Sequence, residues 1–160
     1  MYYSNVRRVM LYGSETWPIT KVDLLRLQRN DRAMIRRICG VRFDQVRTTP
    51  SADLLSRLDL FSIESHLRDG RLRWYGHVHR SSGAIKEAFE LSVDGRRPPG
   101  RPRKTWKDVI ADDLSAWDLN ATDPSDRVSW RKSVKIAMRA DSQTTGTRTT
   151  ATEDSSQPAR

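Results

Sequence analysis

The stretch SIESHLRDGRLRWYGHVHR, residues 62–80, has the spacing of an amphipathic helix. Its apolar and small residues recur at i, i+4, i+7, i+11 and i+15, so they fall on one stripe of a helix. These residues are Ile63, Leu67, Gly70, Trp74 and Val78. The arginines lie mostly off that stripe, and the Ser62 side chain can cap the first turn. We therefore predict a long helix that begins at Ser62 and packs through this stripe.

A second long helix is predicted over residues 20–40. Thr20 and Asp23 resemble a capping box, and Gly40 offers a stop. Apolar residues recur between them near helical spacing: Leu24, Leu27, Met34, Ile35 and Ile38. Asn30 and Asp31 interrupt this apolar stripe. We therefore expect either incomplete burial of the helix or a missing packing partner.

Further helices are predicted on the C-terminal side. Residues 48–61 fit a short capped helix, whereas 84–94 fit either a short helix or a strand. A capping box at 105–108 begins a helix with the apolar face Trp106, Ile110, Leu114 and Trp117. The last helix is predicted to begin at 123–126, with Pro124 at its first helical position. Its inward-facing residues are Trp130, Val134 and Met138.

These patterns together predict a mainly α protein. Small helical clusters would be joined by a basic Pro/Gly-rich arm and followed by a disordered C-terminal tail, because 142–160 holds no Ile, Leu, Val or aromatic residue. The predicted segments are the end of an upstream element (1–19), a helical cluster (20–83), a connector and basic arm (84–104), a two-helix unit (105–139) and the tail (140–160).

The charge of the chain points to a polyanionic partner. The 160 residues carry a net charge of +9, which favours nucleic acid first and an acidic membrane surface second. A soluble basic protein without such a partner is the alternative. The longest apolar run near the N-terminus, Val9–Tyr12, is too short for a signal peptide or a membrane span. We expect an intracellular protein, nuclear or cytoplasmic, with no membrane partner.

The acidic and metal-binding residue types do not form a recognisable catalytic site. Asp112 and Asp113 resemble a polymerase metal-binding pair, but neighbouring helical residues diverge by about 100°, so both are expected on a solvated face. His77 and His79 would point to different sides of their helix. Cys39 stands alone, which rules out an intramolecular disulfide. No catalytic residue, metal or cofactor is predicted, and we expect the chain not to be an enzyme.

Two basic stretches are candidates for nucleic-acid contact. GRRPPGRPRKTW, residues 95–106, is similar to an AT-hook, but Pro99 stands where the hook has its first arginine. Sequence-independent phosphate contact is therefore favoured over minor-groove insertion, and a plain linker remains an alternative. Residues 71–77 place arginines beside rings that could stack on bases, although Trp74 lies on the apolar stripe and is expected to pack in the core.

Four short motifs occur in a characteristic order: Leu11-Tyr12-Gly13-Ser14-Glu15-Thr16-Trp17, Arg36-Arg37-Ile38-Cys39-Gly40-Val41, Arg71-Leu72-Arg73-Trp74-Tyr75-Gly76-His77-Val78, and Gly100-Arg101-Pro102 through Thr105-Trp106. Over about residues 6–135 the chain resembles the C-terminal region of the endonuclease–reverse transcriptase of non-LTR (LINE-type) retrotransposons. The resemblance implies thumb and post-thumb helices that grip template RNA, primer or target DNA, with 20–83 thumb-like. The family's catalytic aspartates and endonuclease match nothing in this sequence.

The charge and the resemblance together predict a non-catalytic nucleic-acid-binding fragment of such a reverse transcriptase. Its expected partners are RNA or DNA phosphates, and the upstream reverse transcriptase domain is a further candidate. The alternative is a vestigial or protein-interaction fragment without nucleic-acid activity. The candidate binding residues are Arg36, Arg37, Arg68, Arg71, Arg73, Arg96, Arg97, Arg101, Arg103, Lys104 and Lys107.

Overall fold

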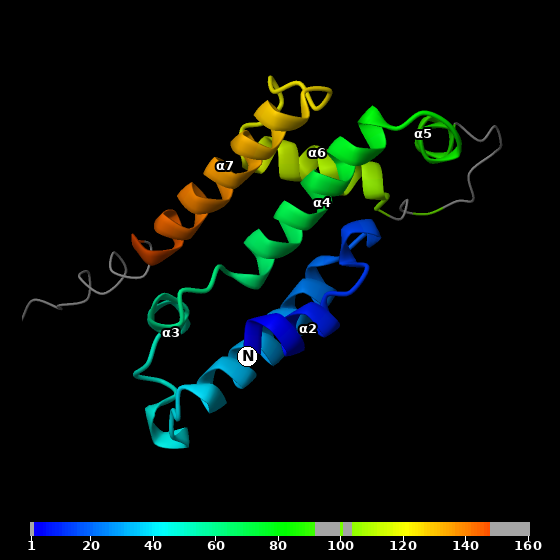
Figure 1. Ribbon diagram of the computed structural model, residues 1–160. Coiled ribbons are helices and arrows are strands. Elements are labelled where there is room, and N and C mark those ends of the chain that lie inside the picture. The colour runs from blue at the N-terminus through cyan, green and yellow to red at the C-terminus, as the bar shows by residue number, and fades with distance from the viewer. Residues whose placement is uncertain (1, 92–99, 101–103, 148–160) are drawn as a thin grey trace, which may run out of the picture.

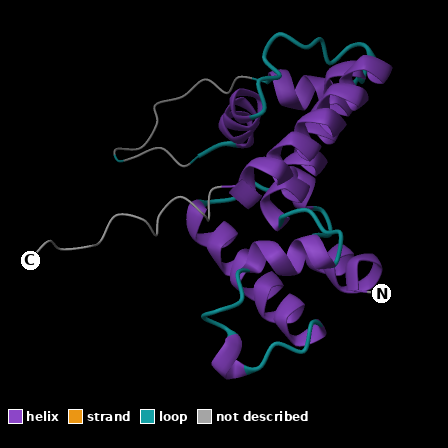
Figure 2. Ribbon diagram, turned by 90° about the vertical axis from the view of Figure 1, so that its left-hand side faces the viewer, coloured by secondary structure: helices purple, strands orange, loops and turns teal. Residues whose placement is uncertain are grey.

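The computed structural model describes residues 2–91, 100 and 104–147, and within them every regular element is helical. The mainly α prediction is thus confirmed (Figures 1 and 2). The α-helices are α1 (Arg8–Met10), α2 (Lys21–Ile38), α3 (Ser51–Arg57), α4 (Ile63–Arg80), α5 (Ala84–Glu90), α6 (Trp106–Ala116) and α7 (Arg127–Thr147). Shorter π- and 3-10 turns are η1 (Tyr2–Arg7), η2 (Ser14–Thr16) and η3 (Phe43–Gln45).

Helix α4 is the centre of the fold. It packs against α2, α5, α6, α7 and the η2 turn, and Figure 1 shows it between α2 on one side and α7 on the other. The short helix α3 bridges α2 and α7. The segment that was predicted to begin at Ser62 therefore organises the elements on both sides of it in the chain.

Because α4 has neighbours on several sides, it buries more than the one predicted stripe. Ile63 and Leu67 pack with Leu11 in a first cluster, against the N-terminal segment and α2. Leu72, about 140° further round the helix from Leu67, is fully buried in a second cluster with residues of α6, α7 and their connection: Trp117, Leu119, Trp130, Val134 and Met138. Trp74 is half-buried, so its predicted place in the core is met only in part.

The predicted caps explain where the helices begin and end. The Oγ atoms of Thr20, Ser62 and Thr105 accept hydrogen bonds from the backbone N–H three residues on, and the Thr105 capping box is complete. Gly40 takes a positive φ of 66°, and the bonds Gly40 N to Arg37 O and Val41 N to Arg36 O close α2 with a Schellman motif. These caps are as the sequence predicts.

The predicted start of the last helix is wrong. Helix α7 begins at Arg127, because the Asp126 carboxylate accepts hydrogen bonds from the backbone N–H groups of Val128 and Ser129. Pro124 therefore lies before the helix, where its carbonyl accepts a hydrogen bond from Arg80. The uncertain segment 84–94 contains the short helix α5.

Both end segments of the predicted division take part in this fold. Leu11 and Arg7, which lie in the segment predicted as the end of an upstream element (1–19), are buried. Helix α7 extends past the predicted two-helix unit as far as Thr147, and the Asp141 carboxylate accepts a hydrogen bond from Ser65 Oγ at 2.6 Å. The remainder of the predicted tail, 148–160, lies outside the described residues.

A buried ion pair supplies the partner that α2 was predicted to need. Arg7, 1% exposed, donates Nε and Nη2 to the two carboxylate oxygens of Asp31 at 3.0 and 2.9 Å. Its Nη1 donates to the carbonyl of Phe61 at 2.8 Å. A buried charge needs such compensation. Asp31 thus joins the N-terminal segment to α2 and to the residue just before α4.

None of the helices in the described part of the chain is both long and apolar enough to cross a membrane.

Candidate nucleic-acid interface

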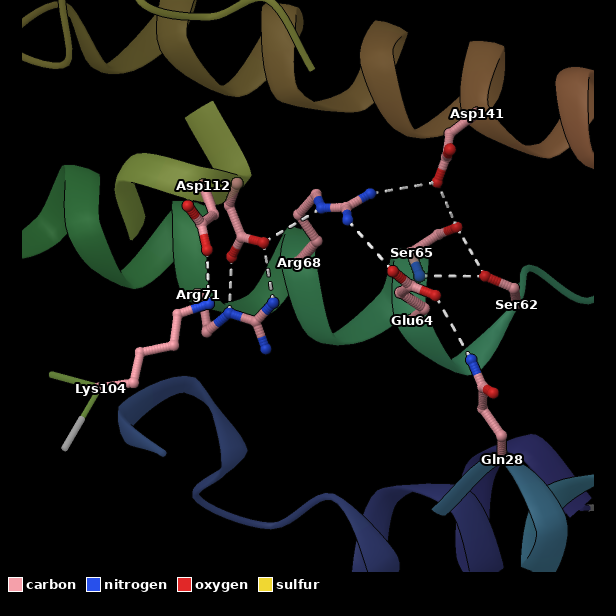
Figure 3. A network of polar contacts seen from close by, with 10 residues as sticks. Gln28, Ser62, Glu64, Ser65, Arg68, Arg71, Lys104, Asp112 and Asp141 are labelled. Atoms are coloured by element: carbon pink, nitrogen blue, oxygen red, sulfur yellow. Dashed lines mark hydrogen bonds and ion pairs between the residues drawn. The ribbon is translucent and has the colours of Figure 1, made fainter. Parts of the chain in front are cut away.

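Two of the predicted binding residues hold the fold together. Arg71 Nε and Nη2 donate to the Asp113 carboxylate at 2.6 and 3.0 Å, and Arg68 Nε donates to Asp113 Oδ1 at 3.1 Å (Figure 3). Arg71 is 6% exposed and Asp113 is 4% exposed. Contact with a phosphate would require these guanidiniums to leave a buried carboxylate unpaired. Arg68 and Arg71 therefore join α4 to α6 through the Asp113 carboxylate.

The position of Asp113 corrects the prediction that both aspartates of the pair lie on a solvated face. Asp112 is exposed, as predicted, but Asp113 is buried against α4. Local periodicity could not reveal this, because the two arginines that stabilise the buried carboxylate lie more than 40 residues earlier in the chain.

The polar network around Arg68 extends to α7. Its guanidinium also contacts Glu64 at 3.3 Å and Asp141 at 3.7 Å, and it lies 5.4 Å from the centroid of the Trp117 ring. Ser65 Oγ joins Asp141 to the hydroxyl of Ser62 (Figure 3). This network fixes α7 and α6 on one helix, which gives the exposed side chains of α7 a rigid support.

Three further predicted binding residues, Arg73, Lys104 and Lys107, are exposed, and each contacts another side chain. Lys104 pairs with Asp112, and Arg73, whose side chain is 54% exposed, contacts Asp69 at 3.3 Å. Lys107 Nζ lies 4.8 Å from the centroid of the Phe89 ring. Ion pairs between exposed side chains are weak, so the cation of such a pair can leave its carboxylate and bind a phosphate.

The two predicted binding residues on α2 differ in how exposed they are. Arg37 is exposed, whereas Arg36 is half-buried and its Nη2 donates to Ser51 Oγ at 3.4 Å. Within the described chain the buried Nε of Arg36 has no hydrogen-bond partner. The arm arginines Arg96, Arg97, Arg101 and Arg103 lie outside the described residues.

Helix α2 carries a broad cationic face. At 100° per residue its arginines fall within an arc of about 140°, on the side away from the buried Asp31 and Ile35. They are Arg26, Arg29, Arg32, Arg36 and Arg37. Arg29, Arg32 and Arg37 are exposed and form no ion pair with any described residue. Three exposed cations that form no ion pair with a described carboxylate make this face a candidate for phosphate contact.

Helix α7 carries a second cationic face, which the sequence prediction missed. Its exposed cations with described side chains fall within an arc of about 140° and are Arg127, Arg131, Lys132, Lys135 and Arg139. Asp141 is the single acidic residue in the sequence of α7, and it bonds to Ser65 of α4. The signal was available for Lys132 and Arg139, which the helical spacing places on the side opposite to Trp130, Val134 and Met138, but not for Arg131, which lies only about 20° round the helix from Met138.

A cavity of about 730 Å³ between the start of α2, α4 and α6 brings together three predicted residues, Arg68, Arg71 and Lys104, with Lys21. Its cations are matched by an equal number of carboxylates, those of Glu64, Asp108, Asp112 and Asp113. The cavity is therefore electrically balanced and does not offer an anion site.

The histidines and the cysteine have ordinary structural surroundings. His77 lies 5.0 Å from Trp74, centroid to centroid, and His79 Nδ1 is 3.4 Å from Ser125 Oγ. Cys39 is half-buried and is a free thiol. Among the described residues, no group of three or more His, Cys, Asp or Glu side chains could hold a metal ion.

No protein-family model, curated protein or solved structure matches this chain. The functional evidence is therefore the distribution of charge and of aromatic side chains over the molecule, together with the sequence motifs.

Proposed function

We propose that this chain is a non-catalytic nucleic-acid-binding piece derived from a non-LTR retrotransposon reverse transcriptase. It contacts the phosphates of template, primer or target DNA through the outer faces of α2 and α7. The observation that carries the proposal is a set of exposed cations on these faces that form no ion pair with any described carboxylate. On α7 they are Arg131, Lys132 and Lys135, and on α2 they are Arg29, Arg32 and Arg37.

The cost of this arrangement supports an anionic partner. Like charges at i and i+4, such as Arg131 and Lys135, destabilise a helix by roughly 0.2–0.5 kcal/mol per pair. A polyanion reverses that repulsion and releases the counterions condensed on its own phosphates. By contrast, several cations outside these faces are offset by carboxylates, as at Arg68, Arg73 and Lys104.

The proposed mode of contact is electrostatic, with little reading of base edges. Arginines and lysines on the outside of rigid helices fix the register of a nucleic-acid backbone but carry no sequence information. Arg68 and Arg71 act indirectly, since they hold α6 and the network around α7 in place. The retrotransposon origin rests on the ordered motifs of the sequence, and the lack of catalysis rests on the missing counterparts of that family's aspartates.

The test is a binding measurement across salt. Fluorescence anisotropy with a DNA duplex, a single strand and an RNA–DNA hybrid should give a binding constant whose logarithm falls linearly with the logarithm of salt concentration. The double variant Arg131→Gln/Lys135→Gln should reduce the magnitude of that slope by about 2, one unit for each lost phosphate contact.

Its matched control is Arg42→Gln/Arg57→Gln, two exposed arginines outside both cationic faces, which should leave the slope nearly unchanged. The absence of binding to all three nucleic acids at low salt would overturn the proposal.

A protein-interaction or vestigial fragment is the second candidate. Exposed apolar side chains favour it, since Val22 and Leu25 on α2 are 57% and 50% exposed and Phe43 is 96% exposed. A vestigial chain should show no cooperative transition in a circular dichroism melt. An interaction fragment should melt cooperatively and bind no nucleic acid at low salt.

A further inference from the structure

An aromatic cavity of about 320 Å³ lies between α4, α5, α6 and the η2 turn. Trp74 of α4, Phe89 of α5 and Trp106 of α6 supply its rings, and Ile85 adds apolar surface. All three rings are half-buried, so each keeps part of its surface open to a ligand. The volume is at the lower end of the range for small-molecule sites, about 300–1,000 Å³, which suits one planar ring system.

Contacts within the protein hold these rings in position. Trp106 Nε1 donates to the carbonyl of Glu15 at 2.8 Å. Phe89 stands edge-on to Trp106, with centroids 5.7 Å apart and planes at 85°, and it also meets Tyr75 edge-on at 6.1 Å. Rings that are fixed before binding lose little conformational entropy when a ligand stacks on them.

The charge at the cavity is positive. Lys107 is exposed and lines the cavity, with its Nζ 4.8 Å from the centroid of Phe89. No carboxylate side chain lines this cavity, whereas three other cavities formed by described residues each include at least one, such as Asp31, Asp23 or Asp113. Rings beside a cation match a base joined to a phosphate.

Segments far apart in the sequence build this cavity. Thr16 and the Glu15 carbonyl come from the segment 11–17, Trp74 and Val78 come from 71–78, and Trp106 follows the basic stretch. Three of the four motifs that carry the retrotransposon resemblance therefore meet at one place on the surface.

We infer that this cavity accepts one unstacked base of a single-stranded nucleic acid, with Lys107 on an adjoining phosphate. The inference rests on the proposed function and adds to it a preference for single strands. A base in a duplex is already stacked and paired, so it cannot enter. Stacking on protein rings is tolerant of sequence, because every base has a π face.

The experiment compares an intact single-stranded oligonucleotide with one of equal length in which central nucleotides are abasic. Both strands carry the same phosphates. The unmodified protein should bind the intact strand about tenfold more tightly. Phe89→Leu, which removes a ring but keeps an apolar side chain, should abolish that preference. Phe43→Leu, the same change at a 96% exposed ring outside the cavity, should leave the preference intact.

A second measurement needs no variant. A strand that carries 2-aminopurine should lose emission when the protein binds it, because stacking on tryptophan quenches the fluorescent base. Equal affinity for the intact and abasic strands with unchanged emission would overturn the inference and leave the phosphate contacts standing. The same result is expected if the cavity instead binds a side chain of a partner protein. Failure to bind either strand at low salt would overturn the proposed function, and this inference with it.

Discussion

At the level of single residues, Gly76 determines how closely α4 and α7 can approach. A Cβ atom at this position would stand 2.5 Å from Nε1 of Trp130, which is fully buried. The same Nε1 donates to the carbonyl of Leu72 at 3.0 Å. A methyl group here would therefore displace a core tryptophan and break its buried hydrogen bond.

Gly76→Ala should lower the free energy of unfolding by about 1–3 kcal/mol, the usual cost of overpacking a core. Urea denaturation would measure the change. The control is Gly70→Ala in the same helix, where a Cβ meets nothing within 4 Å. That substitution should raise the stability by roughly 0.4–1 kcal/mol, because alanine favours a helix. A loss of stability at both positions would contradict the explanation.

His66 couples the stability of the protein to pH. Burial lowers the pKa of His66 below its ordinary value of 6.5, and the neighbouring Arg7 lowers that pKa further, although Asp69 and Asp31 oppose the change. The unfolded chain therefore binds a proton at higher pH than the folded chain does. Stability should be constant well above pH 6.5, fall as the pH drops through 6.5 towards the lowered pKa, and level off below it.

Urea midpoints measured between pH 8 and pH 5 would follow this loss of stability. His66→Gln should flatten the dependence of the urea midpoint on pH around pH 6.5. The control is His77→Gln, which removes an exposed histidine from the same helix and should leave that dependence in place. A slope that survives in His66→Gln would assign the pH dependence to another group.

At the level of the elements, the attachment of α6 to α4 depends on one carboxylate. Asp113 is 4% exposed and accepts hydrogen bonds from both Arg68 and Arg71. Asp113→Asn removes the charge that compensates two guanidiniums, and breaking a buried pair in this way costs about 3–5 kcal/mol. Thermal unfolding of the variant should therefore occur at a clearly lower temperature.

The neighbouring aspartate is a matched control for that experiment. Asp112 is exposed and pairs with Lys104 at the surface. Asp112→Asn should change the free energy of unfolding by less than about 1 kcal/mol. Equal effects at the two positions would show that Asp113 does not tie the helices together.

At the level of the whole molecule, the N-terminal segment belongs to the helical cluster through Arg7. This side chain bonds to Asp31 of α2 and to the Phe61 carbonyl before α4. Arg7→Met should cost about 3–5 kcal/mol, because the buried Asp31 carboxylate loses its partner. The double variant Arg7→Met/Asp31→Leu should recover much of that loss, since two apolar side chains of similar size replace the pair.

A double-mutant cycle on the free energy of unfolding would test this coupling. The expected coupling energy between the two positions is large, at or above the upper end of the usual range of about 0.5–3 kcal/mol, because each single change leaves a buried charge unpaired and the double change does not. Additive effects of the two single changes would mean that the N-terminal segment does not depend on this pair.

The candidate site shows the limits of a local sequence pattern. Arg37 and Arg71 are both arginines that were predicted to contact nucleic acid. Arg37 is exposed, whereas Arg71, which lies beside the aromatic residues of its motif, is buried. Lys132 and Arg139 were missed although the helical spacing places them opposite to the buried Trp130, Val134 and Met138. The difference depends on whether a carboxylate from a distant segment faces the arginine, which no local window contains.

Local sequence patterns were enough to predict the helices, most of their caps and the excess of positive charge. Helix formation depends on residues three or four apart, so a short window of sequence is enough to predict where a helix begins or ends. Such windows hold the capping residues Thr20, Ser62 and Thr105 and the terminating Gly40. Three features became visible in the folded chain alone: α4 buries a second face at Leu72, Arg7 pairs with Asp31, and Arg71 pairs with Asp113. These contacts join residues 24 to 58 positions apart, and chain folding alone brings them together.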